Sequence, residues 1–182
     1  MFTPKIIIIL LWGQNMLEVK ITEEMIILAK NRRAAMPDCI KNSIMSGERT
    51  FEGCLGEVVV ASYLNAEYIT THNFDLIHKE KRLEVKTKVR TVLPKSFYEV
   101  SIANYNTRQI CDNYIFVSLL SPPDKSQDYK TAHIVGHYPK ETFFDNAKFL
   151  RKGDVDPSNN YVVRATCWNM RIKNLMDIND LK

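Results

Sequence analysis

The sequence of 182 residues predicts an α/β layered fold with a mixed central sheet flanked by helices, and three observations carry this prediction. Apolar residues recur at three- and four-residue spacing over 50–64, as in a helix packed on a core. Apolar and charged residues alternate over 82–92, as in a strand with one buried face. Residues 114–119 are apolar apart from one serine, which indicates a strand buried on both faces. The resulting order α-β-β-β-α-β is typical of a layered α/β domain.

The N-terminal residues 1–15 allow two interpretations. Their apolar run at 6–12 is too short to cross a bilayer as a helix, so 1–15 are either an added strand or a leader before a single domain over 16–182. A helix is then expected between Thr22 and Pro37, because acidic residues occupy its first turn and proline ends it. Residues 39–50 indicate a short helix followed by a loop.

The helix over 50–64 contains two glycines, Gly53 and Gly56. Each weakens a helix by about 1 kcal/mol relative to alanine, so close packing or access of a ligand is needed to explain them. The chain then becomes extended, with short strands expected at 68–71 and 74–77 and a turn before the alternating strand. Further strands are expected at 97–102, 132–138 and 161–165, and short helices at 104–111 and 140–147.

The composition narrows the class of protein without naming a function. The apolar fraction of 45% and the charged fraction of 25% are ordinary for a globular protein, and the net charge of +4 is compatible with a polyanionic partner. The four cysteines are far apart and form no C-x-x-C pair, so we expect a reducing, cytoplasmic location. The apolar run at 6–12 is too short to span a bilayer, so we expect no membrane segment. The sequence contains neither G-x-x-x-x-G-K-[ST] nor G-x-G-x-x-G, which argues against ATP-driven and dinucleotide-binding proteins. His133 and His137 fall on an expected strand without a third ligand, so zinc is not expected.

Charged residues on the strand 82–92 and just before it form the first candidate site. Glu84 and Lys86 are two positions apart and therefore leave the same face of the strand. Asp75 lies in an apolar segment one tight turn earlier, where antiparallel pairing would bring it beside Glu84. Two such carboxylates repel each other unless a cation lies between them. Mg²⁺ or Mn²⁺ would supply that charge, with oxygen ligands from Asp75, Glu84 and the Val85 carbonyl.

A third carboxylate, Glu57, comes from the helix over 50–64. On a helical wheel it lies close to Cys54, Ala61 and Leu64, at the edge of the buried face. A half-buried glutamate needs a cation or hydrogen bonds, so Glu57 joins the candidate metal ligands.

At this point the ordered motifs resemble a known family. The helix with G-x-x-G-E, then D-L-I, then the strand with E-V-K is similar to the PD-(D/E)xK nuclease superfamily, over about residues 51–119. Two features depart from the family pattern. Phe74 stands where the motif has its proline, and Gln109 and Tyr114 are five positions apart where some members have a glutamine and a tyrosine four apart. Only Gln109 is therefore a candidate for that second motif.

The resemblance implies a restriction-endonuclease-like αβββαβ core at about 50–138, with extra elements at both termini. It implies that Asp75 and Glu84 bind the metal, that Glu57 helps directly or through water, and that Lys86 lies beside the attacking water. Such an enzyme would be a Mg²⁺-dependent deoxyribonuclease that leaves a 5′-phosphate, and many relatives act as homodimers. Residues expected to contact DNA are Lys88, Arg90, Arg82 and Gln109.

Several functions remain open within this resemblance. The leading interpretation is a DNA endonuclease that is restriction-like, repair-related or structure-specific. The alternatives are an exonuclease or a Holliday junction resolvase with the same site, or a nucleic-acid-binding protein that has lost catalysis. A third class, a structural or interaction protein, would have a merely solvated E-V-K face.

Overall fold

A mixed seven-stranded sheet forms the centre of the protein. The computed structural model describes residues 8–10, 16–35, 50–69, 71, 73–124 and 126–182. Within these residues the strand order is β1-β2-β8-β7-β5-β4-β3, and the pairing of β5 with β7 is parallel whereas the other pairs are antiparallel. The strands are β1 (Ile8–Leu10), β2 (Leu17–Lys20), β3 (Glu67–Tyr68), β4 (Leu76–His78), β5 (Lys81–Arg90), β7 (Asn113–Leu120) and β8 (Thr131–Pro139).

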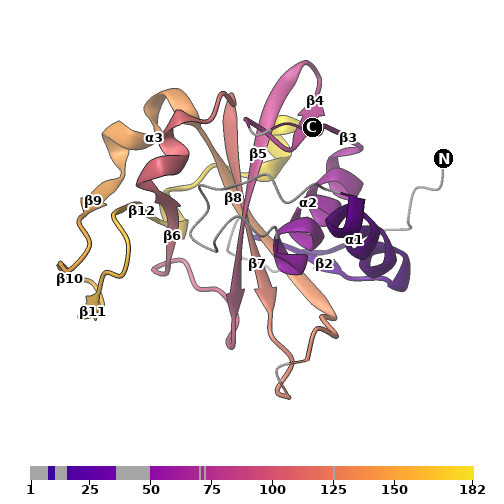
Figure 1. Ribbon diagram of the computed structural model, residues 1–182, viewed down its shortest axis with the longest axis horizontal. Coiled ribbons are helices and arrows are strands. Elements are labelled where there is room, and N and C mark those ends of the chain that lie inside the picture. The colour runs from indigo at the N-terminus through magenta and orange to yellow at the C-terminus, as the bar shows by residue number, and fades with distance from the viewer. Residues whose placement is uncertain (1–7, 11–15, 36–49, 70, 72, 125) are drawn as a thin grey trace.

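Two layers cover this sheet on its opposite faces (Figure 1). Helices α1 (Glu23–Ala35) and α2 (Phe51–Leu64) pack on one face, in the core that contains Leu83 and Val85 of β5. The other face carries a separate core, to which a three-stranded sheet and a short helix contribute. These elements are β6 (Glu99–Ala103), β12 (Cys167–Arg171), β9 (Lys148–Leu150) and α3 (Lys140–Asn146). The protein is therefore an α/β fold with a mixed sheet, as the sequence predicts.

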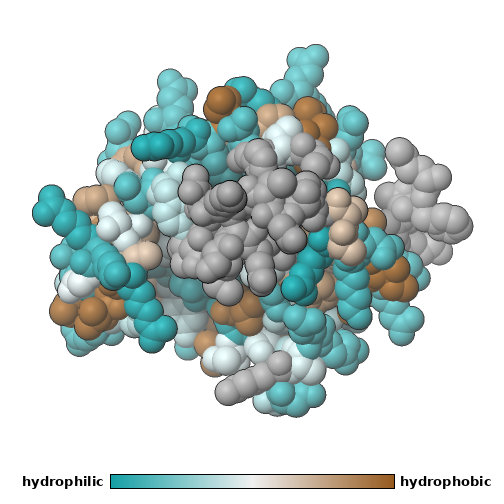
Figure 2. Space-filling view, viewed as in Figure 1, coloured by the Kyte–Doolittle hydropathy of each residue, from teal (hydrophilic) through white to brown (hydrophobic). Residues whose placement is uncertain are grey.

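The remaining short elements lie around the three-stranded sheet and at the C-terminus. The hairpin of β10 (Val155–Asp156) and β11 (Tyr161–Val162) extends from one end of the molecule, where Figure 2 shows apolar side chains beside hydrophilic ones. The 3₁₀ helices are η1 (Asn104–Arg108), η2 (Ile172–Asn174) and η3 (Ile178–Leu181). No helix among the described residues is long and apolar enough to cross a membrane.

Helix α2 begins and ends where the sequence predicts, and its caps explain why. The Thr50 side chain accepts a hydrogen bond of 3.0 Å from the Gly53 amide, and Asn65 ends the helix in the left-handed conformation at φ 54°. Gly56 is required for close packing rather than for a cap, because a Cβ atom there would lie 1.9 Å from the Thr87 Oγ1 atom on β5. Its absence allows the helix to approach the strand that carries the candidate site.

A tight turn sets the register of β4 and β5. Lys79 and Glu80 both have positive φ angles, of 47° and 65°, as the central residues of a two-residue hairpin turn of the primed type do. The turn pairs Leu76 with Leu83 and places the residue before β4 beside the middle of β5.

Predicted and observed elements differ mainly near the C-terminus. A strand is expected at 161–165, but only Tyr161–Val162 is extended there, and the longer strand β12 follows it. The helix expected at 104–111 is the 3₁₀ helix η1, and the strand expected at 82–92 ends at Arg90. The element expected at 39–50 falls almost entirely outside the described residues.

Candidate active site

Strand β5 supplies the centre of the candidate site. Its alternation places Leu83 and Val85 in the core beneath α2, and Glu84 and Lys86 on the opposite face. There the Lys86 Nζ atom lies 2.6 Å from the Glu84 Oε1 atom, and both side chains are largely buried. The face that carries the two charges is therefore enclosed by protein rather than solvated.

Asp75 reaches this strand from the end of β4. The Asp75 amide donates to the Leu83 carbonyl at 2.9 Å, and one Asp75 carboxylate oxygen accepts a hydrogen bond of 2.9 Å from the Val85 amide. Because β4 begins only at Leu76, no residue of β4 pairs with Val85. The Asp75 carboxylate accepts the hydrogen bond from the Val85 amide that a neighbouring strand would otherwise accept. The amide and carbonyl of one strand residue face the same neighbour, so the Val85 carbonyl also faces this position.

The proximity of Asp75 changes the acidity of Glu84. Burial, and then the negative charge of Asp75, raise the pKa of Glu84 from 4.5 to about 8, although Lys86 and Gln109 favour the charged form. Near neutral pH the protein therefore disfavours a negative charge on Glu84 beside that of Asp75. A cation between the two carboxylates would reverse this effect.

Gln109 bridges the two ends of the Glu84–Lys86 pair. Its amide nitrogen donates to the Glu84 Oε1 atom at 2.6 Å, and its amide oxygen accepts from the Lys86 Nζ atom at 3.0 Å. The sequence suggests Gln109 only as a DNA contact or a second-motif residue. The structure places it inside the charged cluster, at the end of η1.

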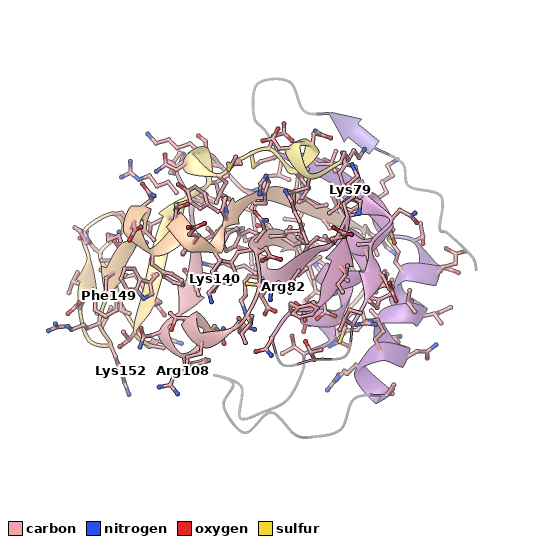
Figure 3. All side chains as sticks on the ribbon, turned by 90° about the horizontal axis from the view of Figure 1, so that it is seen from above. Lys79, Arg82, Arg108, Lys140, Phe149 and Lys152 are labelled. Atoms are coloured by element: carbon pink, nitrogen blue, oxygen red, sulfur yellow. The ribbon has the colours of Figure 1, made fainter. Side chains whose placement is uncertain are left out.

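Two cationic side chains hold the segment that carries Gln109 (Figure 3). The Lys140 ammonium donates to the Gln109 carbonyl, and the Arg82 guanidinium forms two hydrogen bonds to Asp112, of 3.0 and 2.6 Å. The contact of Lys140 was not anticipated, since nothing in the spacing of α3 relates it to residue 109. Arg82 was expected to contact DNA, and its guanidinium is bound to Asp112.

Glu57 lies in a different environment. It is buried between α2 and α1, where the Arg32 guanidinium lies 3.2 Å from its carboxylate and also stacks over the Tyr68 ring at 4.0 Å. The described residues contain no group of three His, Cys, Asp or Glu side chains that could hold a metal ion. The structure thus brings together Asp75 and Glu84 of the expected ligands, and pairs Glu57 with arginine.

The other residues expected at a nucleic-acid interface lie further along β5. Lys88 and Arg90 follow Glu84 and Lys86 on the same face of the strand. Arg90 is held by the Ser118 hydroxyl at 3.1 Å and by the Glu99 carbonyl at 2.9 Å. Lys88 is exposed as a residue, but partial burial of its ammonium, and then the nearby charge of Arg90, lower its pKa.

The two histidines of the H-x-x-x-H spacing are buried on β8. His133 lies 3.5 Å from Glu18, and the His137 ring lies 3.2 Å from the Asn113 side-chain oxygen. Burial is the main cause that lowers the pKa of both imidazoles, so the fold favours their neutral form.

No protein-family model matches the chain. No curated protein sequence matches it either. The functional interpretation therefore depends on the chemistry of the cluster itself.

Proposed function

We propose that this protein is a Mg²⁺- or Mn²⁺-dependent nuclease that hydrolyses phosphodiester bonds of DNA. The observation that carries the proposal is the position of Asp75, whose carboxylate binds the Val85 amide and whose charge acts on buried Glu84. Two carboxylates this close, with Lys86 beside one of them, suit a divalent cation and a phosphate oxygen.

The strand order supports the same proposal at the level of the fold. Helix α2 is followed by β3, β4 and β5, and β5 pairs in parallel with β7 after η1. The sheet contains β3, β4, β5 and β7 as neighbours in that order. This arrangement is compatible with a restriction-endonuclease-like αβββαβ core, with η1 in the place of the second helix and β6 as an insertion.

The residues present fit a cation that is held by few protein ligands. Mg²⁺ in proteins is commonly bound by one or two carboxylates, with waters and substrate phosphates completing its shell. Asp75, Glu84 and the Val85 carbonyl would supply the protein oxygens, so a third carboxylate is not required. When bound, the cation would withdraw electron density from the scissile phosphate.

Lys86 and Gln109 supply the rest of the chemistry. The Lys86 ammonium holds fixed positive charge where negative charge builds up on the phosphate oxygens during hydrolysis. The Gln109 amide keeps Lys86 and Glu84 in a fixed relation, because it donates to one and accepts from the other. This preorganisation would lower the barrier without any movement of the strand.

Incubation of the purified protein with supercoiled and linear DNA tests the proposal. With Mg²⁺ or Mn²⁺ we expect cleavage, and with a chelator none. Asp75→Asn and Lys86→Ala should lose cleavage, whereas Lys130→Ala, which alters an exposed ion pair on another part of the surface, should keep it. Nicking of the closed circle indicates an endonuclease, and digestion of only the linear form indicates an exonuclease. A wild-type protein that cleaves no DNA with either metal would refute the proposal.

A further inference from the structure

A cleft of about 860 Å³ lies beside the candidate active site. One wall is formed by Lys88 and Arg90 of β5, and another by Ser101 of β6. The hairpin β10–β11 closes a further side with Asn159 and Tyr161. We propose that this cleft binds an unpaired nucleotide of the substrate, so that the substrate is nucleic acid with a single-stranded segment. This inference rests on the proposed nuclease function, since it names the form of that enzyme's substrate.

The cleft continues directly from the site along one strand. Glu84, Lys86 and Lys88 leave the same face of β5, and two residues along a strand span about 6.6 Å. That step is of the order of the spacing between neighbouring phosphates in an extended single strand. A strand whose phosphate lies at Lys86 would therefore bring its next nucleotide to the mouth of the cleft.

The charges in the cleft leave cationic groups available to phosphate. Its two carboxylates share one ammonium, because the Lys148 Nζ atom lies 3.0 Å from Glu99 and 2.7 Å from Asp156. The lining also contains three cationic side chains, which outnumber these carboxylates: Lys88, Arg90 and Arg164. The Asn169 amide also donates to Glu99, at 3.1 Å. Lys88 and Arg164, by contrast, are exposed at the cleft. Such groups contact a phosphate backbone irrespective of base sequence.

Aromatic side chains at the rim suit the stacking of bases. The side chains of Phe97 and Tyr161 line the cleft with 59% and 50% of their surface exposed. The Arg164 guanidinium lies 6.0 Å from the centre of the Tyr161 ring. A basic groove interleaved with exposed rings is the arrangement by which proteins bind single strands with little sequence preference.

The size of the cleft favours an unpaired strand over a duplex. Its volume is within the range of sites for small ligands, roughly 300–1,000 Å³, which corresponds to one or two nucleotides. A paired duplex keeps its bases stacked inside and presents only its backbone and groove edges. The rings at the rim would then have no base to contact.

Fluorescence anisotropy with a labelled oligothymidylate tests this inference in the presence of a chelator, so that no cleavage intervenes. We expect the single strand to bind about tenfold more tightly than a blunt duplex of the same length. Tyr161→Ala and Lys88→Ala should each weaken single-strand binding several-fold, whereas Tyr161→Phe, which keeps the ring, should not. Lys30→Ala is the matched charge control, because Lys30 is exposed on α1 across the sheet.

Three outcomes would overturn the inference. In the first, the protein binds duplex and single strand equally tightly. In the second, Tyr161→Ala and Lys88→Ala bind the single strand as tightly as the wild-type protein does. In the third, free thymidine monophosphate competes as strongly as the unlabelled oligonucleotide does. The last would make the cleft a mononucleotide site. Cleavage with Mg²⁺ or Mn²⁺ is measured separately with the same variants. Single-strand binding that depends on the cleft without any cleavage refutes the nuclease proposal alone, and cleavage without dependence on the cleft refutes this inference alone.

Discussion

Two buried glutamates show how differently one fold treats the same side chain. Glu57 and Glu84 are 3% and 5% exposed, on elements that pack against each other. Glu57 lies against the Arg32 guanidinium at 3.2 Å, so positive charge from the neighbouring helix offsets its charge. Glu84 lies near a second carboxylate, Asp75, and its pKa rises to about 8 despite Lys86. Burial beside a like charge, as at Glu84, is the stronger indication of a functional acid, and it is the basis of the proposed site.

The largest expected effect is on catalysis, and it separates the two acids. Glu84→Gln should reduce Mg²⁺-dependent cleavage by more than about 100-fold, because it removes a proposed cation ligand and keeps the shape of the side chain. Glu57→Gln should leave the rate within a few-fold of wild type. The measurement is the initial rate of plasmid nicking at equal concentrations of folded protein. Equal losses of cleavage rate in both variants would indicate that the two glutamates act in one site, and would contradict the distinction between them.

The next effect is on stability, and it has the opposite pattern. Arg32→Met should lower the free energy of unfolding by about 3 kcal/mol, because Glu57 is left as a buried charge without this guanidinium. Glu84→Gln should lower it little at neutral pH, since a neutral amide replaces an acid that is largely protonated. Urea denaturation of both variants measures the difference. A destabilised Glu84→Gln protein beside an unaffected Arg32→Met protein would contradict this assignment.

The pH dependence of unfolding sharpens the same contrast. The fold raises the pKa of Glu84 from its ordinary value of 4.5 to about 8. Between these two pH values the unfolded chain has lost a proton that the folded protein keeps. The free energy of unfolding of the metal-free protein should therefore fall as pH rises from about 4.5 to about 8. Glu84→Gln should remove this decrease, which thermal melts in chelator at several pH values would detect. A wild-type protein whose stability rises across that window through Glu84 would be inconsistent with the raised pKa.

The smallest effect concerns the amide that links the cluster. Gln109→Ala should lower the cleavage rate about tenfold, because Lys86 and Glu84 lose their common partner while both remain in place. Gln109→Glu should shift the pH profile of cleavage as well, since it adds a carboxylate beside Glu84. Single-turnover rates over a range of pH distinguish the two variants. An unchanged rate for Gln109→Ala would limit Gln109 to a structural contact.

Local sequence rules predicted the parts of the site that depend on one strand and one turn. The alternation of β5 places Glu84 and Lys86 on one face, and the hairpin turn brings Asp75 to the same strand. The helical wheel put Glu57 at the edge of the buried face, and the structure buries it further, to 3% exposed. The partner of Glu57 is Arg32 of α1, and this contact depends on how the two helices pack. The spacing of residues within α2 does not predict it.

Longer-range elements were harder to predict for the same reason. The Gln109 side chain reaches β5 because η1 is a short 3₁₀ turn fixed by Lys140, from a helix about thirty positions later. Strand β12 has a polar residue at its centre, Asn169, whose partners Glu99 and Asp156 come from other elements. A polar residue in the middle of so short a segment is more typical of a loop than of a buried strand. The hydrogen bonds that stabilise Asn169 in the strand come from residues far away in the sequence.

The parallel pairing of β5 with β7 affects the order in which the charged cluster forms during folding. The β4–β5 hairpin joins neighbours in the chain, so it needs only a short loop to close. Gln109, by contrast, can meet Lys86 only after the whole crossover has returned and β7 has docked. During synthesis, a ribosome-bound chain that ends before β7 would hold Asp75 and Glu84 without their completing partner. The complete cluster of Asp75, Glu84, Lys86 and Gln109 therefore forms only after β7 has paired with β5, and not when the β4–β5 hairpin closes.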